Sequence, residues 1–226
     1  MAQAKFLSLL LVRAGPTEWD RQGRITGSVD LPLPPTSCSA VAEAGAPYGS
    51  GVAVVLSGPE SAAQTAAKVF APRARVRVVD ELREPGLGLW EGLLETEVEQ
   101  RYRACYREWR ADPSSVSIPE SEPMLAAQSR LVRAVVAQGA RFASDAQHVA
   151  VIVRPIAWGL LRCWAENRAL TDLWGLLEGA VGVQPWNGDS QGHADPSAAL
   201  VTAVLVETTK LKELPPLPRT PTRARA

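Results

Sequence analysis

Three mainly apolar runs, each closed by a turn, constrain the fold of this chain more than any other feature. The runs are Lys5–Val12, Val52–Ser57 and Val149–Val153, and a proline follows each of them within a few residues. Strands that are buried on both faces of a parallel sheet read as continuous apolar runs rather than as alternating polar and apolar residues. We therefore expect a mostly parallel sheet whose two faces are both covered by helices.

Helical segments and further strands lie between and after these runs. The segments that combine strong helix formers with apolar or small residues are Glu60–Phe70, Glu91–Ala111, Glu122–Phe142 and Pro155–Glu166. The additional predicted strands are Arg75–Val79 and Ala199–Glu207. Strands that alternate with helices imply a doubly wound α/β fold, here a three-layer α/β/α sandwich.

The predicted topology also indicates where a ligand would bind. In open α/β sheets, ligands bind where the carboxyl ends of the strands meet the loops that follow. This places Arg13–Pro16, Ser57–Pro59 and Arg154–Pro155 on one rim of the sheet. Two other regions have the composition of loops: Trp186–Pro196 is rich in turn residues, and Leu214–Ala226 is Pro-rich and basic, as disordered tails often are.

Composition argues against several classes of function. The chain has 24 basic and 24 acidic residues, so no positive field for nucleic acid covers the whole surface. The longest apolar stretch is far shorter than the roughly 20 residues of a membrane helix. The three cysteines are scattered, and the only histidines, His148 and His193, lack metal-ligand spacing from each other. We expect no nucleic acid, membrane, metal or cofactor, and a reducing, cytoplasmic location.

Several motifs along the chain resemble those of one enzyme family, and they occur in the family's order. The segments are LVRAGPTEWDRQGRITGSVDLPL (11–33), SGPESAAQTA (57–66), LREPGLGLWEG (82–92), YREWRADP (106–113) and VAVIVRPI (149–156). The first segment resembles L-V-R-H-G-x-T-x-W-N followed by G-R-x-x-G and D-x-P-L. The other four resemble, in the same order, S-S-P-x-x-R-A-x-Q-T-A, L-R-E-x-x-x-G-x-W-E-G, Y-x-x-W-x-x-D-P and V-x-V-V-S-H-G-G. These are the motifs of the histidine phosphatase superfamily, also called phosphoglycerate mutase-like.

The resemblance implies a fold and a set of domain limits. It implies a phosphoglycerate mutase-like domain over residues 1–213, with a helical cap inserted at about 89–122, and it leaves 214–226 as the tail. Trp90 and Trp109 would cover the cap against the sheet, since buried tryptophans are usually part of the core.

The departures from the family pattern bear on the chemistry that the resemblance implies. Family enzymes transfer a phosphoryl group to a histidine, and that position is Ala14 here. The second histidine position is Arg154, and a phosphate-holding arginine aligns with Ser61. Alanine offers no lone pair, and arginine stays protonated, so neither replaces the lost groups. Of the family's five catalytic elements, Arg13 and the proton-donating Glu84 remain.

Each remaining residue has more than one interpretation. Arg13 is either an anion ligand or one half of a structural ion pair. Arg154 either keeps an anion site positive or pairs with Glu84, and we favour the pairing. Glu84 is either an acid or a buried partner of the arginines. Thr17 and Thr26 either frame a substrate or stabilise the loop after the first strand.

The sequence therefore predicts a pseudoenzyme: a histidine-phosphatase-like protein with a ligand- or protein-binding role and a weak anion site formed by Arg13, Arg154, Thr17 and Thr26. The expected ligand is a phosphorylated or other anionic small molecule. The alternatives are an enzyme of altered chemistry that uses Glu84 and a phosphatase with residual activity. A further hypothesis gives the tail a protein partner, because Pro215–Pro218 has P-x-x-P spacing.

Overall fold

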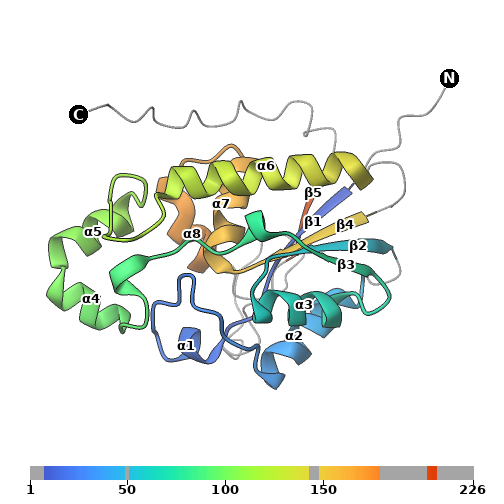
Figure 1. Ribbon diagram of the computed structural model, residues 1–226, viewed down its shortest axis with the longest axis horizontal. Helices are drawn as coiled ribbons and strands as arrows, with labels where there is room; N and C mark the ends of the chain where they lie inside the picture. Colours follow the sequence, from blue (N-terminus) through green and yellow to red (C-terminus); the bar gives the residue numbers. More distant parts are fainter. Residues whose placement is uncertain (1–7, 49–50, 143–147, 179–202, 208–226) are drawn as a thin grey trace, which may run out of the picture.

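A five-stranded sheet forms the centre of the computed structural model, which describes residues 8–48, 51–142, 148–178 and 203–207 (Figure 1). The strands are β1 (Ser8–Arg13), β2 (Val52–Ser57), β3 (Arg75–Val78), β4 (His148–Val153) and β5 (Ala203–Glu207). Their order in the sheet is β3-β2-β4-β1-β5. All neighbours are parallel except β5, which runs antiparallel to β1. The prediction of a mostly parallel α/β sheet is confirmed.

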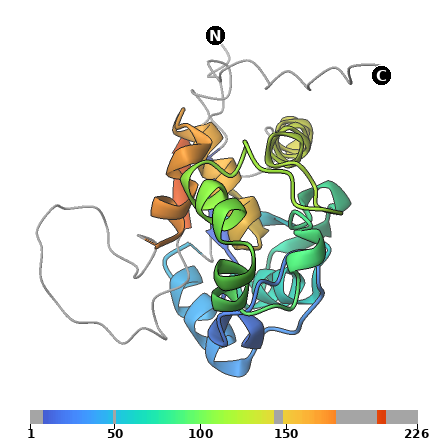
Figure 2. The same cartoon turned by 90° about the vertical axis from the view of Figure 1, so that its left-hand side faces the viewer.

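Helices cover both faces of this sheet. On one face lie α2 (Pro35–Gly45) and α3 (Ser61–Phe70), and on the other lie α6 (Met124–Phe142), α7 (Pro155–Ala165) and α8 (Leu173–Glu178). Figure 2 shows α6 end-on, separated from α2 and α3 by the body of the molecule.

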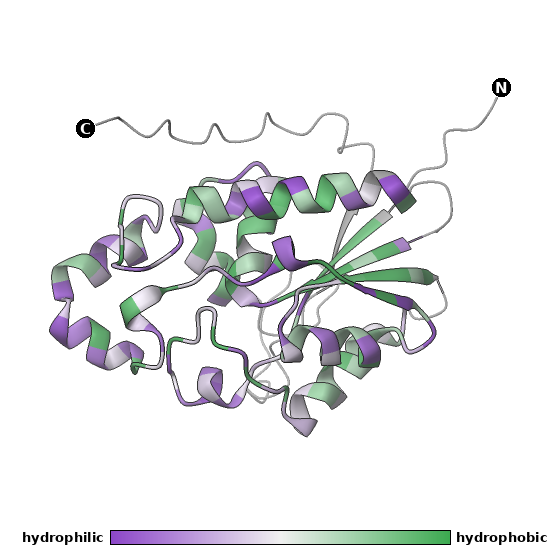
Figure 3. Ribbon diagram, in the orientation of Figure 1, coloured by the Kyte–Doolittle hydropathy of each residue, from purple (hydrophilic) through white to green (hydrophobic). Residues whose placement is uncertain are grey.

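Alternate residues of one strand belong to different cores. Leu9 and Leu11 of β1 pack with the residues of α6 and α7, whereas Leu10 and Val12 pack with those of α2 and α3. This alternation follows from the two-residue period of a strand. It explains why the central strands are apolar throughout, as the colouring of Figure 3 shows.

The region between β3 and α6 contains short helices, namely η1 (Asp80–Leu82), η2 (Gly88–Trp90), α4 (Glu95–Arg101) and α5 (Arg103–Ala111). Helices α4 and α5 stand apart from the sheet, at the left of Figure 1, whereas η1 directly follows β3 and contacts α6. The single helix predicted over Glu91–Ala111 is wrong: the helical residues begin at Glu95, and Tyr102 leaves the helical conformation at φ −122° and ψ 37°.

A tryptophan cluster joins this region to the rest of the core. Trp90 and Trp109 are buried, and their rings meet edge to face with centroids 5.4 Å apart. Trp109 also lies 4.2 Å from the ring of Trp174 in α8, whose indole N–H donates to the Trp109 carbonyl at 3.0 Å. The burial expected for Trp90 and Trp109 is confirmed.

Some predictions differ from the structure or lie beyond the described residues. Helix α2 was not predicted, and α1 (Glu18–Arg21) and η3 (Leu170–Asp172) are further short elements that the sequence did not reveal. His193, the tail over 214–226 and the first residues of the Lys5–Val12 and Ala199–Glu207 strands lie outside the described residues, and the limits of the domain and the cap stay predictions. Among the helices of the described ranges, none is long and apolar enough to span a bilayer.

Candidate functional site

The pairing of β1 with β4 brings two of the predicted site segments together. Arg13 is in register with Val153, so the residues after the two strands, Ala14 and Arg154, leave the sheet side by side. The backbone N–H of Ala14 extends the ladder by donating to the Val153 carbonyl at 2.8 Å. Ala14 is fully buried, so its methyl group belongs to the packed interior at this rim.

Arg13 directs its guanidinium toward α8. Its Nη1 donates to the carbonyl of Leu177 at 3.0 Å, and its Nε is buried without a hydrogen-bond partner in the described residues. Burial lowers the pKa of Arg13, while the charges of Asp20 and Glu84 oppose that shift. An arginine remains charged through such a change, so Arg13 brings a half-buried positive charge to the rim.

Arg154 is almost fully buried, with 2% of its side chain exposed. Its Nη1 lies 3.4 Å from Oδ2 of Asp20, and among the ion pairs of the described residues it has none with Glu84. The pairing with Glu84 that the sequence favoured is therefore wrong. Arg154 does lie near enough to Glu84 to oppose the rise of its pKa.

Asp20 is the residue on which the other predicted anion-binding side chains converge. Its Oδ2 accepts the backbone N–H and the hydroxyl of Thr17, both at 2.7 Å, and its Oδ1 accepts the hydroxyl of Thr26 at 3.2 Å. With Arg154, three of the four residues assigned to the anion site thus contact one carboxylate of the chain itself.

Asp20 was not among the site residues predicted from the sequence. The spacing Thr17-x-x-Asp20 is that of a capping box, and the structure has that box at the start of α1. This spacing was the signal that could have identified the carboxylate.

Glu84 caps the first turn of α7. Its Oε1 accepts the backbone N–H of Ile156 and its Oε2 that of Ala157, each at 2.8 Å. Helix α7 begins with Pro155 and receives no cap from the side chain of Arg154, so Glu84 supplies acceptors that the helix terminus would otherwise lack. Burial raises the pKa of Glu84 to about 7, against the opposing effects of Arg154 and of the two N–H groups.

A second buried carboxyl group, Glu60, lies against the backbone of Glu84. Its Oε1 accepts the Glu84 N–H at 2.5 Å, and its Oε2 is buried without a partner in the described residues. Burial raises the pKa of Glu60 as well. Sequence reasoning missed this residue, although an acid directly after the Gly58-Pro59 turn at a strand end was a visible signal.

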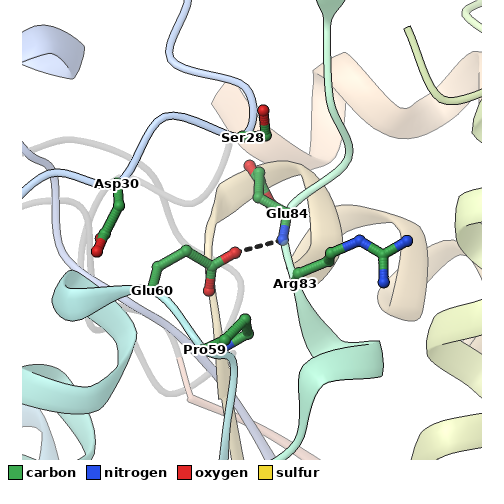
Figure 4. Close-up of a pocket in the computed structure, with 6 residues that line it drawn as sticks. All are labelled: Ser28, Asp30, Pro59, Glu60, Arg83 and Glu84. Carbon is green, nitrogen blue, oxygen red and sulfur yellow. Dashed lines mark hydrogen bonds between the residues drawn. The ribbon is translucent and has the colours of Figure 1, made fainter.

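The adjoining pocket has a volume of about 200 Å³ and an acidic lining (Figure 4). Its lining residues are Ser28, Asp30, Pro59, Glu60, Arg83 and Glu84. Asp30 accepts both the backbone N–H and the hydroxyl of Ser61, each at 2.7 Å, so Ser61 is engaged at the start of α3. Three carboxyl groups against one guanidinium do not favour an anion in this pocket. No cluster of His, Cys, Asp or Glu in the described ranges is arranged to hold a metal ion.

Comparison with known proteins identifies the family to which this chain is similar. The family model described as histidine phosphatase superfamily (branch 1) matches residues 9–183. A curated relative, 2-carboxy-D-arabinitol-1-phosphatase from Triticum aestivum, is 30% identical over 128 residues, which are 55% of this chain and 26% of the relative. The chain thus spans about a quarter of the length of that relative.

Solved structures share the fold at lower identity. Bacillus stearothermophilus YhfR is similar with a TM-score of 0.68 and 22% identity, over 74% of this chain and 84% of its own. A histidine-to-alanine mutant of phosphoserine phosphatase from Entamoeba histolytica, in complex with phosphoserine, has a TM-score of 0.65 and 19% identity, over 75% and 84%. A mycobacterial glucosyl-3-phosphoglycerate phosphatase has a TM-score of 0.62 and 23% identity, over 77% and 85%.

Proposed function

This chain belongs to the histidine phosphatase superfamily, branch 1, and from that premise we propose that it is a pseudoenzyme that binds a phosphorylated or other anionic small molecule without forming a phosphohistidine. The observation that carries the proposal is Ala14, a buried methyl group beside Arg13 at the end of β1. Phosphoryl transfer to the protein needs a lone pair at the attacking atom, and a methyl group has none.

Arg154, which lies beside Ala14 at the rim of the sheet, supports the same conclusion. Arg154 stands where the family has its second histidine, and its guanidinium remains protonated near neutral pH, so it cannot accept a proton. It can still attract an anion. With Arg13, Thr17 and Thr26 it would form the weak anion site of the proposal, with an affinity for inorganic phosphate in roughly the millimolar range.

The relatives suggest the chemical class of the ligand. Their names specify phosphate esters of small polar molecules, phosphoserine among them. The Entamoeba histolytica protein holds phosphoserine although one of its histidines is replaced by alanine. A protein of this fold can therefore retain a phosphomonoester after such a replacement, which is compatible with a binding role for this chain.

A phosphate-release assay tests this proposal. Wild-type protein is incubated with p-nitrophenyl phosphate, 3-phosphoglycerate or phosphoserine, and free phosphate is measured against buffer. We expect no release above the buffer rate. Release that disappears in Glu84→Gln would contradict the proposal and favour an enzyme of altered chemistry, whereas release that persists in Glu84→Gln would favour a phosphatase with residual activity.

The altered-chemistry alternative has one specific observation in its favour. Burial raises the pKa of Glu84 to about 7, which is where a general acid or base works best near neutral pH. Both of its oxygens already accept backbone N–H groups at 2.8 Å, an arrangement that also suits a purely structural cap. The response of any activity to Glu84→Gln decides between the two roles.

A further inference from the structure

The carboxylate of Asp20 is bound in the way that a small anion would be. It accepts hydrogen bonds from one backbone N–H and two hydroxyl groups, which belong to Thr17 and Thr26, and it forms an ion pair at 3.4 Å with the guanidinium of Arg154. Oxyanions in proteins are recognised by just such charge-assisted and neutral donors. The donors come from the loop after β1 and from the residue after β4, so two separate parts of the chain meet on this one carboxylate.

Asp20 also stands between solvent and the buried positive charge. Its side chain is 24% exposed, whereas that of Arg154 is 2% exposed. An anion that arrived from solvent would have to replace the Asp20 carboxylate in order to reach Arg154. The Nε atoms of Arg13 and Arg154 are buried without hydrogen-bond partners in the described residues, so each guanidinium group retains an unused donor.

Glu84 is not the carboxylate that contacts Arg154. Both of its carboxylate oxygens are bonded to the first turn of α7, and its backbone N–H is bonded to Glu60. The carboxylate that neutralises Arg154 by direct contact is that of Asp20.

We propose that Asp20 is an internal ligand that fills the oxyanion site, and that loss of its charge opens Arg154, Thr17 and Thr26 to inorganic phosphate or sulfate. This inference rests on the anion site of the proposed function. It identifies Asp20 as the residue that sets the affinity of that site for phosphate. The physical reason is that a buried guanidinium left without its carboxylate needs another anion.

The experiment compares phosphate binding by wild type and Asp20→Asn with isothermal titration calorimetry. We expect the Kd for inorganic phosphate to fall at least about tenfold in the variant, which corresponds to about 1.4 kcal/mol. Glu18→Gln is the matched control, because Glu18 lies in the same helix α1, is exposed and loses the same charge. The Kd of Glu18→Gln should equal that of wild type, and adding Arg154→Gln to Asp20→Asn should remove the gain.

The outcomes separate this inference from the proposed function. An unchanged Kd in Asp20→Asn, or an equal gain in Glu18→Gln, overturns the inference and leaves the absence of turnover untouched. Turnover of a phosphate ester by wild type overturns the proposed function, while the comparison of Kd values still stands.

Thermal unfolding covers the case in which Asp20→Asn is unstable. Phosphate should raise the unfolding midpoint of Asp20→Asn, or of Asp20→Ser, more than chloride does at equal ionic strength, since a ligand of the folded state stabilises it. If neither variant is folded in concentrated phosphate, an anion cannot replace the carboxylate and the inference is overturned.

Discussion

The backbone N–H of Glu84 donates a hydrogen bond of 2.5 Å to Oε1 of Glu60, so the carboxyl group of one buried acid lies against the backbone of another in the lining of the acidic pocket. Burial raises the pKa of both groups. The two residues have different surroundings: both oxygens of Glu84 are bonded to α7, whereas one oxygen of Glu60 has no partner in the described residues. Protonation of this pair should therefore affect the stability of the fold.

The first prediction concerns the pH dependence of stability. The pKa of Glu84 rises from an ordinary value of 4.5 to about 7 on folding, so the folded protein binds more protons than the unfolded chain between these values. The contribution of Glu84 to the free energy of unfolding is therefore greatest below pH 4.5 and is lost as the pH rises through about 7.

Chemical denaturation of wild type and Glu84→Gln at a series of pH values checks this prediction. The stability of wild type relative to Glu84→Gln should fall by on the order of 3 kcal/mol from acid to mildly alkaline pH. Asp80→Asn is a matched control, because Asp80 is exposed and lies in η1 just before Glu84. A difference between wild type and Glu84→Gln that does not change with pH would show that folding does not raise the pKa of Glu84.

The second prediction concerns Ala14, which we propose stands at the position of the family's histidine nucleophile. Ala14 is fully buried and its backbone is hydrogen-bonded to Val153, so the larger side chain of Ala14→His would have to displace packed neighbours. We expect a loss of about 1–3 kcal/mol in the free energy of unfolding and no phosphatase activity, even together with Arg154→His. Ser61, which we propose stands at the position of a phosphate-holding arginine, would still be unchanged, and its hydroxyl is bonded to Asp30. Rapid phosphate release by the double variant would show that the rest of the site is intact.

The third prediction concerns the support of the Glu84 segment. Arg130 of α6 bonds both oxygens of Glu122, at 2.8 and 2.5 Å, and donates to the carbonyls of Glu81 and Arg83 at 2.6 and 3.1 Å. Arg130→Ala should lower the free energy of unfolding by about 1–3 kcal/mol, because it leaves several acceptors unpaired.

Arg133→Ala is the matched control for Arg130→Ala, since Arg133 is an exposed arginine of the same helix. It should change the free energy of unfolding by no more than about 0.5 kcal/mol. Equal losses in the two variants, measured by denaturant unfolding, would contradict a specific role for Arg130.

The strands could be predicted closely because their signal is local. β2 matches its predicted bounds, and β4 differs by one residue, since a strand buried on both faces is apolar throughout. Helix α2 could not be predicted in the same way. Its sequence, PTSCSAVAEAG, begins with residues that are common in turns and has its strong helix formers only in the second half, so packing on the sheet contributes to it as much as propensity does.

The site was predictable in its location and not in its contacts. The predicted topology placed Arg13 and Arg154 on one rim of the sheet, and the pairing of β1 with β4 agrees and shows that their strands are neighbours. The motifs did not reveal that Arg154 contacts Asp20 rather than Glu84, because the choice between two carboxylates depends on how α1 and α7 pack. Glu122 likewise pairs with Arg130 of α6. The predicted position of Glu122 at the start of a helix did not indicate this contact.

Phosphorus NMR of phosphoserine in the presence of the wild-type protein tests directly whether this chain binds a phosphomonoester without hydrolysing it. We propose that it does, because Ala14 cannot accept a phosphoryl group. The ester resonance should shift or broaden as protein is added, and no resonance of inorganic phosphate should grow beyond that of the buffer control. An inorganic phosphate resonance that grows with time in proportion to the protein concentration would contradict this proposal.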